Sequence, residues 1–216
     1  MSRLRQISWG DKPEKLLLLS GGLDSVVMFH DLLQSGMKFR CMWIDYGQKN
    51  ARAEQKVVTE LCTKHMIALQ SVFCPVVFEQ TRSSLLATGV GEHSVRTDEI
   101  KFRNGVLAGI AASHCTQPTT ILIGAHKTSA AYADATPTFY IKLSRVIHWG
   151  TNSQVDVEAP YIRMTKKQIL DRAWDIALTP SDLALSVSCY DGNNCGKCPA
   201  CKNRMEALRL SKFHRY

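Results

Sequence analysis

The sequence of 216 residues contains no run of 18 apolar residues, so we expect no membrane-spanning segment. Its first residues, 1–6, hold no apolar core of the kind that a secretory signal has. Two common nucleotide-binding turns are also missing: the loop ending in Gly-Lys-Ser or Gly-Lys-Thr, and Gly-x-Gly-x-x-Gly. There is no internal repeat and no low-complexity segment. These absences predict a cytoplasmic globular protein.

The composition is ordinary for such a protein, with 45% hydrophobic and 21% charged residues. The length suits one domain with a sizeable core and a small appendage. A formal net charge of +8 suits nucleotide phosphates, nucleic acid or an acidic protein partner. Because the charges are spread along the chain rather than run together, they do not by themselves indicate nucleic-acid binding.

Eight cysteines are present, in two groups. Cys41, Cys62, Cys74 and Cys115 are scattered in apolar surroundings, which is typical of core thiols. The other four are crowded near the C-terminus at the spacing of metal ligands. Both uses suit a reducing compartment, in agreement with a cytoplasmic location.

The most informative stretch begins with the apolar run 16–19, which predicts a short buried strand. A glycine turn and a helical spread of apolar residues follow. Backbone N–H groups and the positive end of the helix dipole meet at such a helix start and favour an anion. A carboxylate beside a bound phosphate repels it unless a metal ion or a cation lies between them. The residues of this turn are Ser20, Gly21, Gly22, Asp24 and Ser25.

Strands and helices are predicted to alternate along the rest of the chain. Strands are expected near 39–44, 67–73, 119–123 and 155–158, and helices near 51–64, 103–114, 137–149 and 165–177. Residues 1–14 are expected to form an irregular lead-in. This order predicts a doubly wound, mostly parallel α/β sheet with right-handed crossovers. Its ligand is expected outside the carboxyl ends of the strands, where Asp45 and the glycine turn lie.

The C-terminal cysteines have the spacing Cys189-x5-Cys195-x2-Cys198-x2-Cys201. Four thiolates form a closed tetrahedral site, which is typical of structural rather than catalytic zinc. An iron–sulfur cluster is the alternative occupant of four cysteines. The sequence therefore predicts a small C-terminal metal-binding element.

Several cations lie near expected helix starts or strand ends. Lys166 follows the expected N-cap Thr165, where the helix dipole disfavours a cation unless a phosphate lies between them. A solvated lysine is an equally good interpretation. Arg103 lies at another helix start, and His126 and Lys127 follow a strand end. For His126 we prefer a packed or hydrogen-bonded histidine.

Taken together, these motifs resemble the 7-cyano-7-deazaguanine synthase family over roughly residues 15–205. The resemblance is carried by the Ser-Gly-Gly-x-Asp-Ser turn, by Asp45-Tyr46-Gly47-Gln48, by Arg103-Asn104 and by the four cysteines. It implies an ATP pyrophosphatase-type domain, similar to adenine nucleotide alpha hydrolases, over 1–185 and a zinc-binding tail over 186–216. ATP, Mg2+ and Zn2+ are the implied cofactors, and a homodimer is expected.

The implied enzyme is an ATP-dependent carbon–nitrogen ligase. It adenylates the carboxylate of 7-carboxy-7-deazaguanine, couples it to ammonia to give an amide, and dehydrates the amide to the nitrile. The implied catalytic residues are Asp24, Arg103 and Lys166. The implied cofactor-binding residues are Ser20, Gly21, Gly22, Asp24, Ser25, Asp45, Tyr46, Gln48 and Lys127. The implied substrate residues are Asn104, Tyr132 and Asp134, and the implied metal ligands are Cys189, Cys195, Cys198 and Cys201.

The sequence departs from the family pattern around the expected substrate pocket. It has Tyr132-Ala133-Asp134-Ala135-Thr136 where the family has Tyr-Pro-Asp-Cys-Arg, and Lys101-Phe102 where the family has Pro-Gly. Ala133 and Thr136, in place of the proline and the arginine, remove bulk and a fixed cation. An alternative acceptor is therefore an amine of a protein or other macromolecule, as in divergent members associated with bacterial anti-phage systems. A tRNA sulfur-transfer enzyme and a zinc-stabilised nucleotide-binding module are lower-ranked alternatives.

Overall fold

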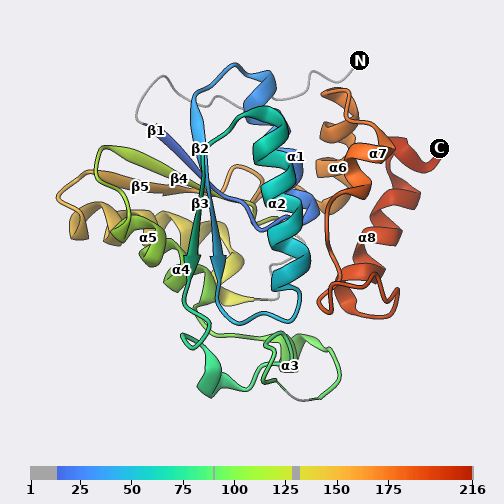
Figure 1. Cartoon of the computed structure of the whole chain (residues 1–216), viewed down its shortest axis with the longest axis horizontal. Helices are drawn as coiled ribbons and strands as arrows, with labels where there is room; N and C mark the ends of the chain where they lie inside the picture. The colour runs from blue at the N-terminus through green and yellow to red at the C-terminus, as the bar shows by residue number, and fades with distance from the viewer. Residues whose placement is uncertain (1–13, 90, 128–131, 216) are drawn as a thin grey trace.

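The computed structural model describes residues 14–89, 91–127 and 132–215 (Figure 1), so nearly all of the expected lead-in over 1–14 lies outside the described residues. A sheet of five strands, all paired in parallel, has the order β3-β2-β1-β4-β5. This confirms the predicted α/β class. The strands are β1 (Glu14–Leu18), β2 (Phe39–Asp45), β3 (Leu69–Phe73), β4 (Thr119–Ile123) and β5 (Val155–Glu158).

Helices cover both faces of this sheet (Figure 1). The helices of the described chain are α1 (Leu23–Gln34), α2 (Ala51–His65), α3 (Val95–Asp98), α4 (Arg103–Ser113), α5 (Pro137–Gly150), α6 (Lys166–Asp175), α7 (Pro180–Ala184) and α8 (Pro199–Leu210), of which α3 lies away from both faces. Successive side chains of a strand point to opposite faces. Leu17 accordingly packs in one core with α1, α2 and α6, whereas Leu16 packs in a second core with α4 and α5.

The direction of winding changes at β1. The chain passes from β1 to β2 and β3 on one side, and then returns to place β4 and β5 on the other side. The loops that follow β1 and β4 therefore border the crevice where doubly wound sheets bind ligands. They approach closely: a Cβ atom added to Gly124 would lie 3.3 Å from the backbone nitrogen of Ser25.

The predicted elements agree with the observed ones to within a few residues. The third strand begins at Leu69, and the helix predicted over 165–177 is α6, with Thr165 as its N-cap. A capping box fixes this helix start, since the Thr165 side chain accepts from the Gln168 N–H and the Gln168 side chain accepts from the Thr165 N–H. Three helices, α3, α7 and α8, were not predicted.

The C-terminal segment packs on the main sheet domain. Ala207 of α8 and Phe213 belong to the same hydrophobic core as α1 and α6. Arg204 ties the start of the segment to α8 by donating to the carbonyl oxygens of Leu183 and Ser186, at 2.7 and 2.9 Å. The division between 1–185 and 186–216 stays a prediction. Among the described helices, none combines the length and the apolar character needed to span a bilayer.

Candidate active site

The glycine turn after β1 is held in shape by its own hydroxyl groups. Ser20 Oγ accepts from the Gly22 N–H at 3.3 Å and lies 3.2 Å from Ser25 Oγ, while Ser25 Oγ donates to the Gly22 carbonyl at 3.0 Å. Gly21 has a φ of +71°, and a Cβ atom there would lie 3.2 Å from the carbonyl oxygen of Glu54. The turn therefore needs glycine and opens directly into the N-terminus of α1.

Three charged or polar side chains meet beside this turn. Lys166 Nζ, from the first turn of α6, donates to Asp24 Oδ2 at 2.5 Å. His126 Nε2, from the loop after β4, lies 3.5 Å from the same oxygen. Burial, together with the nearby Lys166 charge, lowers the pKa of His126 despite the opposing effect of Asp24, which favours a neutral imidazole at pH 7.

A cavity of about 390 Å3 lies at the carboxyl ends of β1, β2 and β4, and it contains most of the predicted site residues. Those that line it are Ser20, Gly22, Asp24, Ser25, Tyr46, Gln48, Arg103, Asn104, Tyr132, Asp134 and Lys166. A second cavity of about 540 Å3, beside α5 and the residues after β5, contains none of them. The first cavity is therefore the candidate active site.

Three predicted cofactor-binding residues do not line this cavity. Gly21 lies behind the turn, where it packs against α2. Asp45 accepts the Gly47 N–H at 2.9 Å, and so its carboxylate stabilises the turn after β2. Lys127 has an exposed side chain and donates its backbone N–H to the Met164 carbonyl at 2.8 Å.

The far end of the cavity is built around Arg103 and Asp134. Asp134 Oδ2 accepts from the Asn104 N–H at 2.9 Å, and Asn104 Nδ2 donates to the Asp134 carbonyl oxygen at 2.9 Å. The Arg103 guanidinium lies 5.9 Å from the centre of the Tyr46 ring. Burial opposes the charge of Arg103, but nearby Tyr46 and Asp134 outweigh it, and the pKa of Arg103 is raised.

The sequence did not single out Glu54, which also lines the cavity. Its carboxylate accepts from Trp43 Nε1 at 3.2 Å, from Gln48 Nε2 at 2.8 Å and from Asn50 Nδ2 at 3.1 Å. Burial raises the pKa of Glu54 to about 7, although these three hydrogen bonds oppose the shift. A signal was present in the sequence, because an acidic residue in the first turn of α2 faces its buried side.

The four C-terminal cysteines come together as predicted. The Sγ atoms of Cys189, Cys195, Cys198 and Cys201 all lie within 4.8 Å of one another. Hydrogen bonds from neighbouring backbone N–H groups outweigh burial and lower the pKa of Cys189 to about 6. The cluster can therefore hold a metal ion.

This cluster is joined directly to the candidate active site. The Val187 N–H donates to the Gly21 carbonyl at 2.9 Å, and Asn50 Nδ2 donates to the Cys189 carbonyl at 3.3 Å. Tyr190, Val187 and Ser188 also line the cavity. The presence of these three residues in the cavity lining could not be predicted from the sequence, because it depends on how the C-terminal segment packs.

The fold and this site define a doubly wound α/β protein with a glycine turn at the switch point of its sheet. The family model for "Queuosine biosynthesis protein QueC" matches residues 14–212. The chain therefore belongs to the QueC family.

Curated relatives agree with this assignment. A 7-cyano-7-deazaguanine synthase of Desulfotalea psychrophila is 32% identical over 208 residues, which covers 91% of this chain and 94% of the relative. An enzyme of the same name from Methanoregula boonei is 29% identical over 205 residues, covering 90% and 93%. Among solved structures, the U34-tRNA thiolase NcsA from Methanococcus maripaludis with its [4Fe-4S] cluster is 17% identical at a TM-score of 0.48, covering 91% of this chain and 72% of that one. That likeness is too low to support an argument about function.

Proposed function

We propose that this protein is an ATP-dependent 7-cyano-7-deazaguanine synthase. The observation that carries the proposal is a single cavity that joins the glycine turn, Asp24 and Lys166 at one end to Arg103 and Asp134 at the other. Such a cavity allows a nucleotide and a second substrate to meet. The second substrate is 7-carboxy-7-deazaguanine, as the names of the curated relatives suggest.

In the first step, a carboxylate oxygen attacks the α-phosphorus of ATP and the bond to pyrophosphate breaks. Ser20, Ser25 and the N–H groups at the start of α1 bind the phosphates, and Lys166 offsets the charge of the departing pyrophosphate. Asp24 is the residue suited to hold Mg2+, since among the described residues its buried Oδ1 atom has no hydrogen-bond partner. Bound Mg2+ supplies charge neutralisation at the phosphates.

In the second step, ammonia attacks the activated carbonyl carbon and AMP leaves, giving the amide. A second adenylation, on the amide oxygen, followed by loss of AMP and a proton, gives the nitrile. In this proposal Asp134 accepts hydrogen bonds from the amino group and ring N–H of the deazaguanine. The two hydrogen bonds between Asn104 and Asp134 support the proposal, because they hold Asp134 in position. Arg103 stabilises negative charge at the reacting end.

We further propose that the cysteine cluster holds structural zinc. With Zn–S bonds of about 2.3 Å, the sulfur atoms of a tetrahedral site lie about 3.8 Å apart. The four Sγ atoms all lie within 4.8 Å of one another, so movements of about 1 Å would bring them to that separation. An iron–sulfur cluster requires a wider spread, because iron and sulfide atoms occupy the space between the cysteines.

Incubation with ATP, Mg2+, 7-carboxy-7-deazaguanine and ammonium tests the function. We expect AMP and pyrophosphate to be released only when the acid is present, and the product to have the mass of the nitrile. Asp24→Asn is the variant to compare with the wild type, because it keeps the size of the side chain and removes its charge.

Two results would contradict the proposal. One is the absence of acid-dependent AMP. The other is steady AMP release without nitrile, together with a deazaguanine-sized mass gain on a co-encoded protein, which would favour transfer to a macromolecular amine.

A further inference from the structure

The segment that links β3 to α4 borders the candidate active site and is held at two places. The first is the turn after β2, where the Lys49 N–H donates to the Leu85 carbonyl and the Ala87 N–H donates to the Gly47 carbonyl, both at 2.8 Å. Leu85 itself lines the cavity. This attachment uses backbone groups and places one end of the segment at the cavity.

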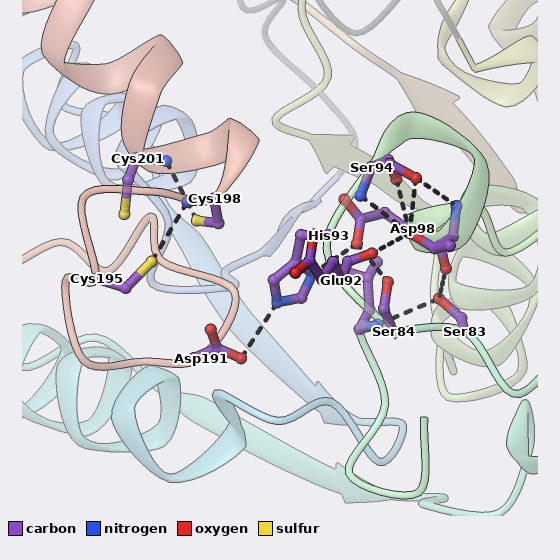
Figure 2. A network of polar contacts seen from close by, with 12 residues as sticks. Ser83, Ser84, Glu92, His93, Ser94, Asp98, Asp191, Cys195, Cys198 and Cys201 are labelled. Atoms are coloured by element: carbon purple, nitrogen blue, oxygen red, sulfur yellow. Dashed lines mark hydrogen bonds and ion pairs between the residues drawn. The ribbon is translucent and has the colours of Figure 1, made fainter. Parts of the chain in front are cut away.

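The second attachment is a histidine between two carboxylates (Figure 2). His93 Nδ1 lies 2.7 Å from Asp98 Oδ1 of α3, and His93 Nε2 lies 3.2 Å from Asp191 Oδ1 in the four-cysteine loop. Both contacts are hydrogen bonds only when each ring nitrogen carries a proton, because a carboxylate can only accept. The bridge thus requires the imidazolium form and joins two segments about a hundred residues apart.

Asp98 is buried, and a second hydrogen bond holds its carboxylate in place. Its side chain is fully inaccessible, and its Oδ1 atom also accepts from Ser84 Oγ at 2.6 Å. Burial opposes the charge of His93, but its hydrogen bonds to Asp98 and Asp191 outweigh that effect, and the pKa of His93 is raised. A buried carboxylate is strongly unfavourable without such a partner.

The bridge lies directly behind the cavity wall. The His93 ring packs against Tyr190, with 5.2 Å between ring centres. Tyr190 and Tyr132 both line the cavity, and Asp98 is close enough to contribute to the raised pKa of each, after burial. His93 and Asp98 do not line the cavity, so they act on it only through these neighbours.

We propose that His93 is a positioning residue for the deazaguanine substrate, because its bridge between Asp98 and Asp191 fixes Tyr190 in the wall of the cavity. This inference rests on the proposed function. The bridge lies at the end that holds Arg103 and Asp134, since Tyr190 and Tyr132 both interact electrostatically with Arg103. The ATP end depends on other elements, as Asp24 comes from α1 and Lys166 from α6.

The test compares His93→Ala with His148→Ala in the full-length, metal-loaded enzyme. His148 is a suitable control because its Nδ1 also lies close to a carboxylate, 3.1 Å from Asp156 Oδ1, but it comes from α5 and lies outside the cavity lining.

We expect His93→Ala to raise the KM for 7-carboxy-7-deazaguanine about tenfold, the factor that corresponds to one net hydrogen bond, and to leave the KM for ATP unchanged. His148→Ala should leave both unchanged. His93→Gln, which retains two N–H donors without the charge, should lie between wild type and His93→Ala.

Hydrogen exchange of peptides from 83–89, 91–102 and 189–198 provides a readout that needs no turnover. Faster exchange at both ends of the bridge in His93→Ala supports the proposed role of the bridge. Unchanged exchange overturns that role. Faster exchange with both KM values unchanged, or raised equally, overturns the positioning role and leaves a purely structural contact. A wild-type enzyme that forms no AMP from this acid overturns the proposed function itself, and the positioning role with it.

Discussion

At the scale of single residues, Lys166 is the side chain whose position most clearly suggests a part in the proposed reaction. A lysine in the first turn of α6 is unfavourable for the helix dipole, yet its ammonium group lies 2.5 Å from Asp24 in the cavity. We therefore expect Lys166→Met to reduce AMP formation by about a hundredfold, a typical loss when one charge-stabilising donor is removed. The measurement is acid-dependent AMP release.

Lys167→Met is the matched control. Lys167 is the next residue of the same helix turn, but it is exposed and pairs with Asp171. It should retain near-normal activity. Equal losses in the two variants would remove Lys166 from the reaction.

His30 predicts a loss of stability in acid. Burial, followed by the nearby His65, lowers the pKa of His30 to about 4 from an ordinary 6.5. The unfolded chain therefore binds more protons than the folded one between these values, so the free energy of unfolding falls as pH drops from about 6.5 to about 4. Urea unfolding at several pH values measures this, and His30→Phe should make the decline shallower.

His114→Phe serves as the control for that experiment, because His114 is exposed at the end of α4. Its pH profile should follow the wild type. If His30→Phe has the same acid slope as wild type, other groups are responsible for the decline.

The residue scale also shows what the sequence could reveal about the site. Ser20, Asp24 and Ser25 were predictable because their turn is contiguous, and strand, glycine and helix follow in order. Tyr190 reaches the cavity only through tertiary packing, so its neighbours in the sequence carry little information, whereas Glu54 was detectable as an acidic residue on the buried side of α2. Asp45 was predicted beside the nucleotide; it accepts the Gly47 N–H and does not line the cavity, and its role at the nucleotide stays a prediction.

At the scale of elements, the turn after β2 depends on one glycine. Gly47 has a φ of +89°, and a Cβ atom there would lie 2.4 Å from the Pro75 carbonyl oxygen. Gly36, at the end of α1, has a φ of +69° but no atom within 4 Å of such a Cβ. We expect Gly36→Ala to cost about 1 kcal/mol, from the left-handed conformation alone, and Gly47→Ala to cost more, because backbone must also move.

Urea unfolding of both variants measures that difference. Gly47→Ala should also reduce activity, since Tyr46 and Gln48 on either side line the cavity. Equal stability of the two variants would show that the turn can relax around the added methyl group.

The cysteine loop gives a second prediction at this scale. In Cys198→Ser the thiolate ligand is lost, but serine is a good N-cap and can replace the Sγ that accepts the Cys201 N–H. Any loss of stability therefore reports on the metal rather than on the start of α8. We expect elemental analysis to find one zinc per chain in the wild type and much less in the variant, with a lower melting temperature.

Cys74→Ser is the control, since Cys74 is half-buried and lies outside the cluster. It should keep its zinc. Iron with sulfide in the wild type, or a metal-free protein of unchanged stability, would refute the zinc assignment.

The predictability of the elements follows from how each is stabilised. The strands were predicted because parallel strands covered on both faces form short continuous apolar runs, as β1 and β4 do. Helix α8 was missed although Pro199 at its first position and the cap at Cys198 are start signals. These signals are ambiguous, because the same residues also belong to the metal-ligand spacing.

At the scale of the whole molecule, the metal-binding segment and the sheet domain share contacts that favour one cooperative unit. Ala207 and Phe213 lie in the core beside α1, and Val187 is hydrogen-bonded to the glycine turn. The boundary at 185 is what the family resemblance implies, whereas cooperativity depends on the area shared between the two parts. The resemblance cannot report that area.

We therefore predict that metal release and loss of secondary structure occur together. In a urea titration, far-UV circular dichroism and a zinc-binding dye should give the same midpoint. Arg204→Met, which removes the hydrogen bonds to Leu183 and Ser186, should shift both midpoints down by the same amount. Lys202→Met, an exposed position on the same helix, should shift neither. Zinc release at a lower urea concentration, while the sheet persists, would instead establish the C-terminal segment as an independently unfolding element attached to a domain that is stable without it.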